Sequence, residues 1–569
     1  MSHRVYKKLH GRRYAYEYES YYDPKLKRSR QRMVRYLGPC DRQGRILSEP
    51  RVRPESISSS FPVGSLVAFY AAARELRLQE RVQQALQLDK VESARVVVLA
   101  LNQATARVAL YRLPSWVQAS PLPRWLGLSP EKLTSGSFED ALSSLCHLTP
   151  EKTWEDRGLV LQHELTRAWR NGSREPSGAY YDITKQAYYG SHCPYAQLGH
   201  DERGTAVVVG FGMVVSKEHH HPILCRALHG GQNDFLSVSP TLEFLQGQGL
   251  KHLTLVMDKG MTSKPNVAQA VKAGYHVVGS VKGWSKEAVA YASRFPGEEL
   301  ERTENVVATS HGGAVYAKAF TAPLMDFPRL RIAVVENLLR KAEDRQARDL
   351  LLQELEGPVS KKRLEEVRAE LGEVIVSSVG RRGFKVDPKA VEVERDLDGR
   401  FLLFSTDLAL DGPDMYEAYF AKDAVEKAFR TSKGDLSLGP VRYRRKDRLD
   451  AYATVVYLAY LLWSWAERKL RAKYPERRLS EALRPLESLS WVRFGAGKSV
   501  REWNTRLTRE QRDLLSAIGG LELLPATKSR EKAGQTRQFL ERKPVATGAR
   551  FSGGSRETTR ELSGPALAR

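Results

Sequence analysis

The stretch "KHLTLVMDKGMTSKPNVAQAVKAGYHVVGSVK", residues 251–282, contains a complete strand–helix–strand pattern. It begins with a short apolar run that ends on Asp258, which is typical of a buried strand. A segment with helical periodicity follows, and a second apolar run begins after Gly274. This alternation predicts an α/β sheet.

The same alternation continues on both sides of this unit. Three upstream segments have strand patterns and a helical segment with glycines near its end follows them, at 178–190, 204–216, 222–230 and 234–250. Downstream, two charged helical segments interrupt the alternation, at 338–357 and 360–372, before a strand pattern resumes at 399–408. The sequence therefore predicts a mixed α/β sheet with an insertion before its last strand.

Composition narrows the function. The chain has 569 residues, too many for one ordinary core, and a formal net charge of +23. This charge favours a polyanion such as nucleic acid as the partner; a merely basic soluble protein is the alternative. The four cysteines are scattered, which fits a reducing compartment.

No segment predicts a membrane location. The N-terminus has no apolar signal segment, and the most apolar run, 451–465, is too short to span a bilayer. We therefore expect a cytoplasmic protein, associated with the nucleoid in a bacterium.

Shifts in composition divide the chain into seven segments. In chain order we expect a basic β-rich unit (1–58), a helical region for DNA binding or dimerisation (59–174), the first part of the sheet (175–298), an insertion (299–395), the second part of the sheet (396–475), a helical region (476–524) and a basic, disordered tail (525–569). Two alternatives stay open: the first unit either contacts phosphates or is solvated, and the 59–174 helices are either functional or a structural bundle.

Two isolated acids stand out in strand contexts. Asp182 lies within the strand pattern "YYDITKQ", and Asp258 ends the apolar run "LTLVMD". A carboxylate is costly to desolvate there unless it is paired or bound to a cation, and strand ends of α/β sheets are where sites assemble. A hydrogen-bonded structural acid is the alternative for each.

A third acid lies in the segment "YFAKDAVEKAFRTSK", residues 419–433. At about 100° per residue, Tyr419, Lys422, Glu426 and Lys433 fall within an arc of roughly 60° on a helix. Alanines and Val425 occupy the other side. The stripe suits a nucleic-acid backbone, with a solvent-facing row of ion pairs as the alternative.

Three converging carboxylates repel one another unless cations neutralise them. Mg²⁺ prefers oxygen ligands and is typically held by a few carboxylates plus phosphate oxygens. We therefore expect Asp182, Asp258 and Glu426 to be catalytic and to hold two Mg²⁺ ions, with Mn²⁺ as an alternative. Lys422 and Lys433 would then bind DNA phosphates as point charges, and Tyr419 would donate a hydrogen bond to one.

These residues carry a family resemblance. The spacing of Tyr419, Lys422, Glu426 and Lys433 resembles the Tyr-x2-Arg-x3-Glu-x6-Lys motif of one branch of DDE (Asp-Asp-Glu) insertion-sequence transposases, with Lys422 in place of the usual Arg. The segments around Asp258 and Asp182, and "SLGPVRYRRKDRLDAYATVVYLAYLL", are also similar to that branch. The resemblance covers roughly 1–475.

The resemblance implies an RNase H-like core, with the insertion between the second Asp and the Glu. It implies magnesium-dependent cleavage at terminal inverted repeats, followed by strand transfer into target DNA by a homodimer. In hairpin-forming relatives a flipped base stacks on an aromatic side chain. Trp284 is a DNA-binding candidate for that role, with packing as the alternative.

Two other functions remain open at this point. One is an RNase H-like nuclease that cuts DNA without strand transfer. The other is a domesticated DNA-binding protein without catalysis, which the presence of all three acids disfavours.

Overall fold

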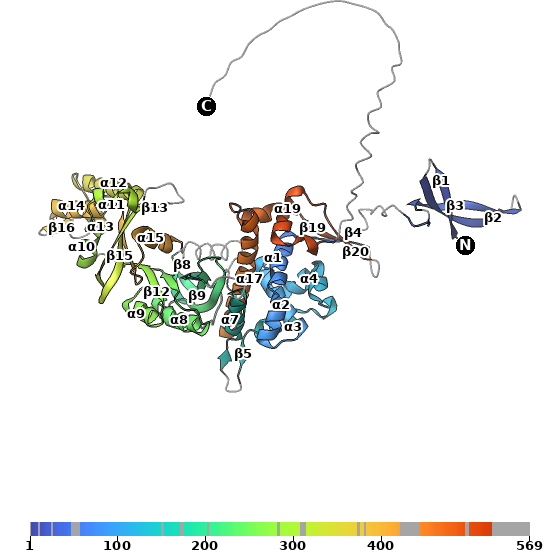
Figure 1. Cartoon of the computed structure of the whole chain (residues 1–569), viewed down its shortest axis with the longest axis horizontal. Coiled ribbons are helices and arrows are strands. Elements are labelled where there is room, and N and C mark those ends of the chain that lie inside the picture. Colours follow the sequence, from blue (N-terminus) through green and yellow to red (C-terminus); the bar gives the residue numbers. More distant parts are fainter. Residues whose placement is uncertain are drawn as a thin grey trace, which may run out of the picture. The chain divides into compact units, whose positions relative to one another are not determined.

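The computed structural model describes most of the chain up to residue 525 (Figure 1). The chain divides into two units, Met1–Pro525 and Ala526–Arg569, and every described residue belongs to the first. The described residues are 2–9, 12–23, 27–41, 43–46, 57–149, 153–170, 176–201, 204–281, 285–307, 315–371, 376–379, 383–421, 441, 443–495 and 500–525.

The N-terminus forms a three-stranded antiparallel sheet of its own, with β2 in the centre. Its strands are β1 (Ser2–Leu9), β2 (Arg12–Asp23) and β3 (Arg28–Cys40). Tyr14, Tyr16 and Tyr18 alternate with other residues in β2, and tyrosine is enriched in strands. All three strands lie within residues 1–58, for which the sequence predicts a basic β-rich unit.

Several short helices pack around one long apolar helix, α17 (Lys446–Lys473). The helices are α1 (Gly64–Glu75), α2 (Leu78–Leu86), α3 (Lys90–Ala104), α4 (Leu113–Ala119), α5 (Leu122–Leu126), α6 (Ser135–Ser143), α7 (Arg157–Arg170), α18 (Leu479–Leu486) and α19 (Arg509–Ile518). Phe69 of α1 stacks on Trp463 of α17 with ring centroids 5.6 Å apart. Within the described parts of the chain, no helix has both the length and the apolarity that a bilayer crossing needs.

A small sheet of three short strands accompanies these helices. Strand β19 (Ser490–Phe494) lies between β4 (Ile57–Pro62) and β20 (Arg501–Asn504) in an antiparallel sheet. Segments more than 400 positions apart in the sequence therefore meet here. The role of the helices in DNA binding or dimerisation stays a prediction.

The central sheet is mixed, as predicted. Its first strands are β7 (Gly178–Ala187), β8 (Gln197–Asp201), β9 (Gly204–Ser216), β10 (Pro222–His229), β11 (Thr254–Met257) and β12 (His276–Ser280). The order is β10-β9-β7-β11-β12, in which β7, β9 and β10 are antiparallel while β11 runs parallel to both β7 and β12. Helices α8 (Val238–Gly247) and α9 (Lys264–Lys272) connect the later strands. This arrangement is the expected RNase H-like one.

The sheet continues beyond β12. Strand β18 (Arg400–Ser405) pairs antiparallel with β12 on one side and with β15 (Phe327–Asn337) on the other. Strand β14 (Val315–Leu324) pairs with β15, and β13 (Val306–Val307) ends this row of nine strands, with β8 as the tenth strand of the sheet beside β9. Part of the predicted insertion thus extends the central sheet.

Residues 338–398 leave this sheet at the end of β15 and return to it at β18. They contain α12 (Leu338–Leu355), α13 (Lys361–Leu371), the β16–β17 hairpin (Val376–Val379 and Gly383–Val386) and α14 (Pro388–Leu397). Leu355, Val367, Ala390 and Val391 form a small hydrophobic core separate from the main one. The charged helices expected at 338–357 and 360–372 lie here.

Candidate active site

Asp182 and Asp258 lie level with each other on two neighbouring parallel strands. Strands β7 and β11 pair in register up to Tyr181 and Met257; Asp182 is the next residue of β7, and Asp258 directly follows the last residue of β11. Paired strands are about 4.8 Å apart. The structure therefore brings together two acids that are 76 positions apart in the sequence.

The Asp182 side of β7 faces α17. Residues two apart on a strand share a face, and Thr184 pairs across strands with Phe211, whose ring is 6.1 Å from that of Tyr452 in α17. Asp182 itself is partly exposed, and its Oδ1 accepts a hydrogen bond of 2.8 Å from the Ile183 N–H. The carboxylate is thus oriented but still accessible.

The turn that carries Asp258 is held by specific hydrogen bonds. The Met261 N–H donates to the Asp258 carbonyl at 2.9 Å. The buried side chain of Asn266 donates from Nδ2 to the carbonyls of Met261 and Phe235, at 2.8 and 2.9 Å. These bonds tie the start of α9 to the turn, so the position of Asp258 is fixed by packed structure.

Tyr419 contacts Asp258 directly. It lies near the end of α15 (Gly412–Phe420), is 7% exposed, and donates its hydroxyl hydrogen to Asp258 Oδ1 at 3.3 Å. The Asp411 side chain caps this helix. A Cβ on Gly412 would lie 2.3 Å from the Ala317 carbonyl oxygen, so the glycine lets α15 pack closely against β14.

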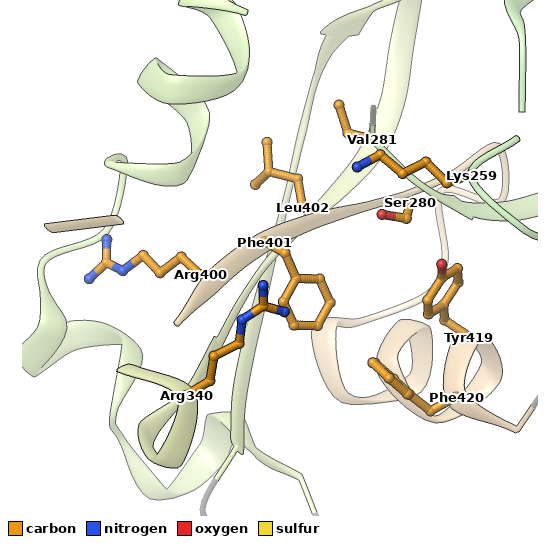
Figure 2. Close-up of a pocket in the computed structure, with 9 residues that line it drawn as sticks. All are labelled: Lys259, Ser280, Val281, Arg340, Arg400, Phe401, Leu402, Tyr419 and Phe420. Carbon is orange, nitrogen blue, oxygen red and sulfur yellow. The ribbon is translucent and has the colours of Figure 1, made fainter. Parts of the chain in front are cut away.

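A cavity of about 340 Å³ opens beside this pair (Figure 2). Strand ends contribute to its lining, α12 adds a cation, and α15 adds two aromatic rings. The lining residues are Lys259, Ser280, Val281, Arg340, Arg400, Phe401, Leu402, Tyr419 and Phe420. The Phe420 ring centroid is 5.3 Å from that of Tyr419 and 5.9 Å from that of Phe401. The cavity thus combines aromatic and cationic groups next to a carboxylate.

The cations of this cavity are not equivalent. Arg400 is 6% exposed and donates to the fully buried Glu336 at 2.8 Å and to the carbonyls of Ala292 and Phe295. Arg340 is 64% exposed, and Lys259 is also exposed. Arg400 therefore stabilises the wall, whereas Arg340 and Lys259 are accessible to a ligand.

Comparison with solved structures gives a weak similarity. No family model and no curated protein sequence matches the chain. Among solved structures, the chain is similar to the cryo-EM structure of piggyBac transposase in a synaptic complex with hairpin DNA, at a TM-score of 0.36 and 8% identity over 86% of each chain. A similarity of this degree establishes neither a family nor an activity.

The remaining predicted site residues lie outside the described residues. These are Lys422, Glu426, Lys433 and Trp284. Among the residues that the structure does describe, no three His, Cys, Asp or Glu side chains form a group that could hold a metal ion. The structure thus brings together Asp182, Asp258 and Tyr419 and leaves the roles of all seven residues as predictions.

Sequence reasoning missed the cavity residues Lys259, Arg340, Phe401 and Phe420. Lys259 and Phe420 directly follow Asp258 and Tyr419 in the chain, so their position next to predicted site residues could have indicated them. Arg340 and Phe401 reach the cavity only through the pairing of β12, β18 and β15. No local pattern reports that pairing.

Proposed function

We propose that this protein is a DDE transposase that cleaves DNA at inverted repeats and transfers the cut ends into target DNA. The observation that carries the proposal is the adjacency of Asp182 and Asp258 on parallel strands of an RNase H-like sheet. Two partly exposed carboxylates on adjacent strands repel each other, and a shared cation relieves that repulsion. Their pairing in one place favours a shared ligand.

Magnesium fits the donors that are present. Asp182 and Asp258 offer only carboxylate oxygens, the ligands that Mg²⁺ prefers. We assign Glu426 as the third carboxylate. Two anchors of the described chain support this assignment: Tyr419 contacts Asp258, and Val441 forms a parallel bridge with Tyr188, the residue directly after β7. Glu426 lies between these two anchors in the sequence.

In the proposed reaction Asp182, Asp258 and Glu426 would hold two divalent ions, Mg²⁺ or Mn²⁺. The bound ions would supply electrostatic stabilisation of the charge that develops on the scissile phosphate. Tyr419 orients the Asp258 carboxylate through its hydroxyl. The rigid turn between Asp258 and Asn266 keeps the carboxylate in place during turnover.

The DNA end would contact the cationic and aromatic groups around the acids. We assign Lys422 and Lys433 to phosphates and Trp284 to stacking on a base. The cavity beside Tyr419 supports a nucleotide ligand, because Lys259 and Arg340 suit phosphates and the Phe420 ring suits a base. A homodimer on two inverted repeats completes the proposal.

The deciding experiment uses the DNA that flanks the gene. A supercoiled plasmid with both flanks is incubated with the protein and Mg²⁺, and cleavage is mapped at nucleotide resolution. We expect cuts at short inverted repeats, and loss of cutting with EDTA. Cuts at random positions, or metal-independent cutting, would contradict the proposal.

A second assay separates transposase from nuclease. Pre-cut ends and a supercoiled target plasmid are supplied together, and joined products are sequenced. We expect joined ends. Cleavage without joining would favour the nuclease, and end binding without cleavage would favour a domesticated DNA-binding protein.

A further inference from the structure

The N-terminal sheet sorts its side chains into two chemically different faces. The face with Tyr14, Tyr16, Tyr18 and Tyr36 is rich in aromatic rings, and Lys7 lies over two of them. The opposite face, the arginine face, carries the basic residues Arg4, Lys8, Arg13, Arg28, Arg30, Arg32 and Arg35, as the strand register places them.

An irregularity in β3 brings its arginines to one face. Arg32 and Arg35 are three positions apart, so a regular strand would turn them to opposite faces. A register shift between Glu17 and Tyr18 places an extra residue in β3, so that Arg32 pairs opposite Glu19 and Arg35 opposite Glu17. Both arginines accordingly reach carboxylates of one row.

The ion pairs on this face are weak enough to exchange. Arg30 lies 3.5 Å from Asp23 and Arg32 lies 3.0 Å from Glu19, and the side chains of Arg30, Arg32 and Arg35 are 50–71% exposed. Exposed ion pairs contribute only about 0–1 kcal/mol each. A phosphate can therefore replace the carboxylate at little cost, and the basic residues still outnumber the three acids of the face.

The shape of the sheet suits a DNA groove. Strand β1 pairs only with the stretch of β2 up to Glu19, so Ser20–Asp23 and Arg28–Gln31 project as a two-stranded ribbon. The major groove of B-DNA is about 12 Å wide and admits such a ribbon. At the other end of the sheet, the Tyr6 ring packs against Gly44, so the open part of the face is the ribbon side.

We propose that the arginine face of the N-terminal sheet binds the major groove of duplex DNA. The β3 arginines contact the phosphates along one side of the groove. Glu17, Glu19 and Tyr21 of the central strand face the base edges, where a carboxylate can accept from a cytosine amino group. The inference takes DNA as the partner from the proposed function, but it concerns a site separate from the acids.

Binding of a 40-bp duplex by the full-length chain, without metal, tests this. The triple variant Arg30→Ser, Arg32→Ser, Arg35→Ser should bind at least about tenfold more weakly, and the slope of log K against log salt should fall by about 3. The matched control Lys361→Ser, Lys362→Ser, Lys389→Ser removes the same charge from exposed positions of the insertion. It should leave the slope unchanged. Equal effects of both variants, or none, would overturn the proposal.

Two further measurements guard against misfolding of the serine variant. Replacing the same three arginines by lysine should keep most of the salt slope, since the charge remains. In the wild-type chain, the duplex should protect Tyr21 from nitration but not its neighbour Tyr22, which the strand alternation places on the opposite face. Equal protection of both tyrosines, or tighter binding of a 40-nucleotide single strand, would refute a groove-bound arginine face. Neither readout needs cleavage, so the catalytic proposal can fail or succeed independently.

Discussion

Tyr419 and Asp258 are 161 positions apart in the sequence, yet the tyrosine hydroxyl donates to the aspartate carboxylate at 3.3 Å. Tyr419 belongs to α15, which packs against the far part of the sheet, whereas Asp258 directly follows β11 in the first part. The contact therefore depends on β18, the strand that joins the two parts. Orientation of the acid is a property of the whole sheet.

Removing this hydroxyl should slow cleavage. In the Tyr419→Phe variant the ring stays and the donor is lost; a hydrogen bond to a charged group contributes about 1.5–3 kcal/mol. We expect a cleavage rate roughly 10- to 100-fold lower at fixed Mg²⁺. Tyr416→Phe, three residues earlier on the same helix, is the control and should retain near wild-type activity. Similar losses in both variants would assign the effect to α15 packing.

The two aspartates should be indispensable for chemistry and dispensable for binding. Asp182→Asn and Asp258→Asn should each lower cleavage by at least about 1,000-fold, because an amide replaces a charged magnesium ligand. Gel-shift affinity for DNA should stay within a few fold. Asp234→Asn is a nearby control, since Asp234 pairs with Lys185 at 3.6 Å; it should remain active. An active Asp258→Asn variant would exclude that residue from catalysis.

Two arginines of the same cavity should behave in opposite ways. Replacing Arg400 by Met leaves the fully buried Glu336 with Lys341, at 3.1 Å, as its remaining ion-pair partner in the described structure. Breaking a buried pair costs about 3–5 kcal/mol, which urea denaturation would detect. Arg340→Ala should leave the free energy of unfolding within about 0.5 kcal/mol and weaken DNA binding instead. A stability loss for Arg340→Ala alone would reverse the assignment.

Asp156 should make stability depend on pH. Burial and the nearby Asp450 carboxylate raise the pKa of Asp156 from 3.8 to about 6. A raised pKa in the folded state gives stability that is present below pH 4 and lost as the pH rises through 6. Asp156→Asn should therefore gain up to about 3 kcal/mol over wild type at pH 7.5, and nothing at pH 4.

Thermal unfolding of both proteins at several pH values checks this. The control is Asp140→Asn, an exposed position on α6. Its difference from wild type should be the same at every pH. A pH-independent effect of Asp156→Asn would show that the carboxylate stays protonated or fully hydrated in the folded protein.

The strands of the central sheet were predictable, but their order was not. Apolar runs and alternation predicted strands at 178–190, 204–216, 222–230 and 399–408, and the structure has β7, β9, β10 and β18 there. The β14–β15 hairpin within the predicted insertion was not foreseen. Pairing of β15 with β18 joins residues about 70 positions apart, and hydrophobic patterns carry no record of such partners.

The site was predictable to a similar degree. Asp258 could be predicted because it is a lone acid directly after an apolar strand. Its position beside Asp182 follows from the parallel register of β7 and β11. The sequence predicted that Tyr419 donates to a phosphate, whereas in the structure its hydroxyl reaches Asp258. A motif spacing reports which residues share a helix face, but only the packed sheet decides what that face meets.

The segment 338–398 leaves and rejoins the sheet at neighbouring positions of β15 and β18. The Asn337 N–H donates to the Gly399 carbonyl at 3.0 Å, and Glu336 pairs with Arg400 across the two strands. Because its two ends are hydrogen-bonded to each other and it has a small hydrophobic core of its own, this segment has the character of an inserted module. Such a module can be replaced, enlarged or lost during evolution without a change in the order of the strands that hold the acids. For the same reason, another domain can be grafted at this position by protein engineering.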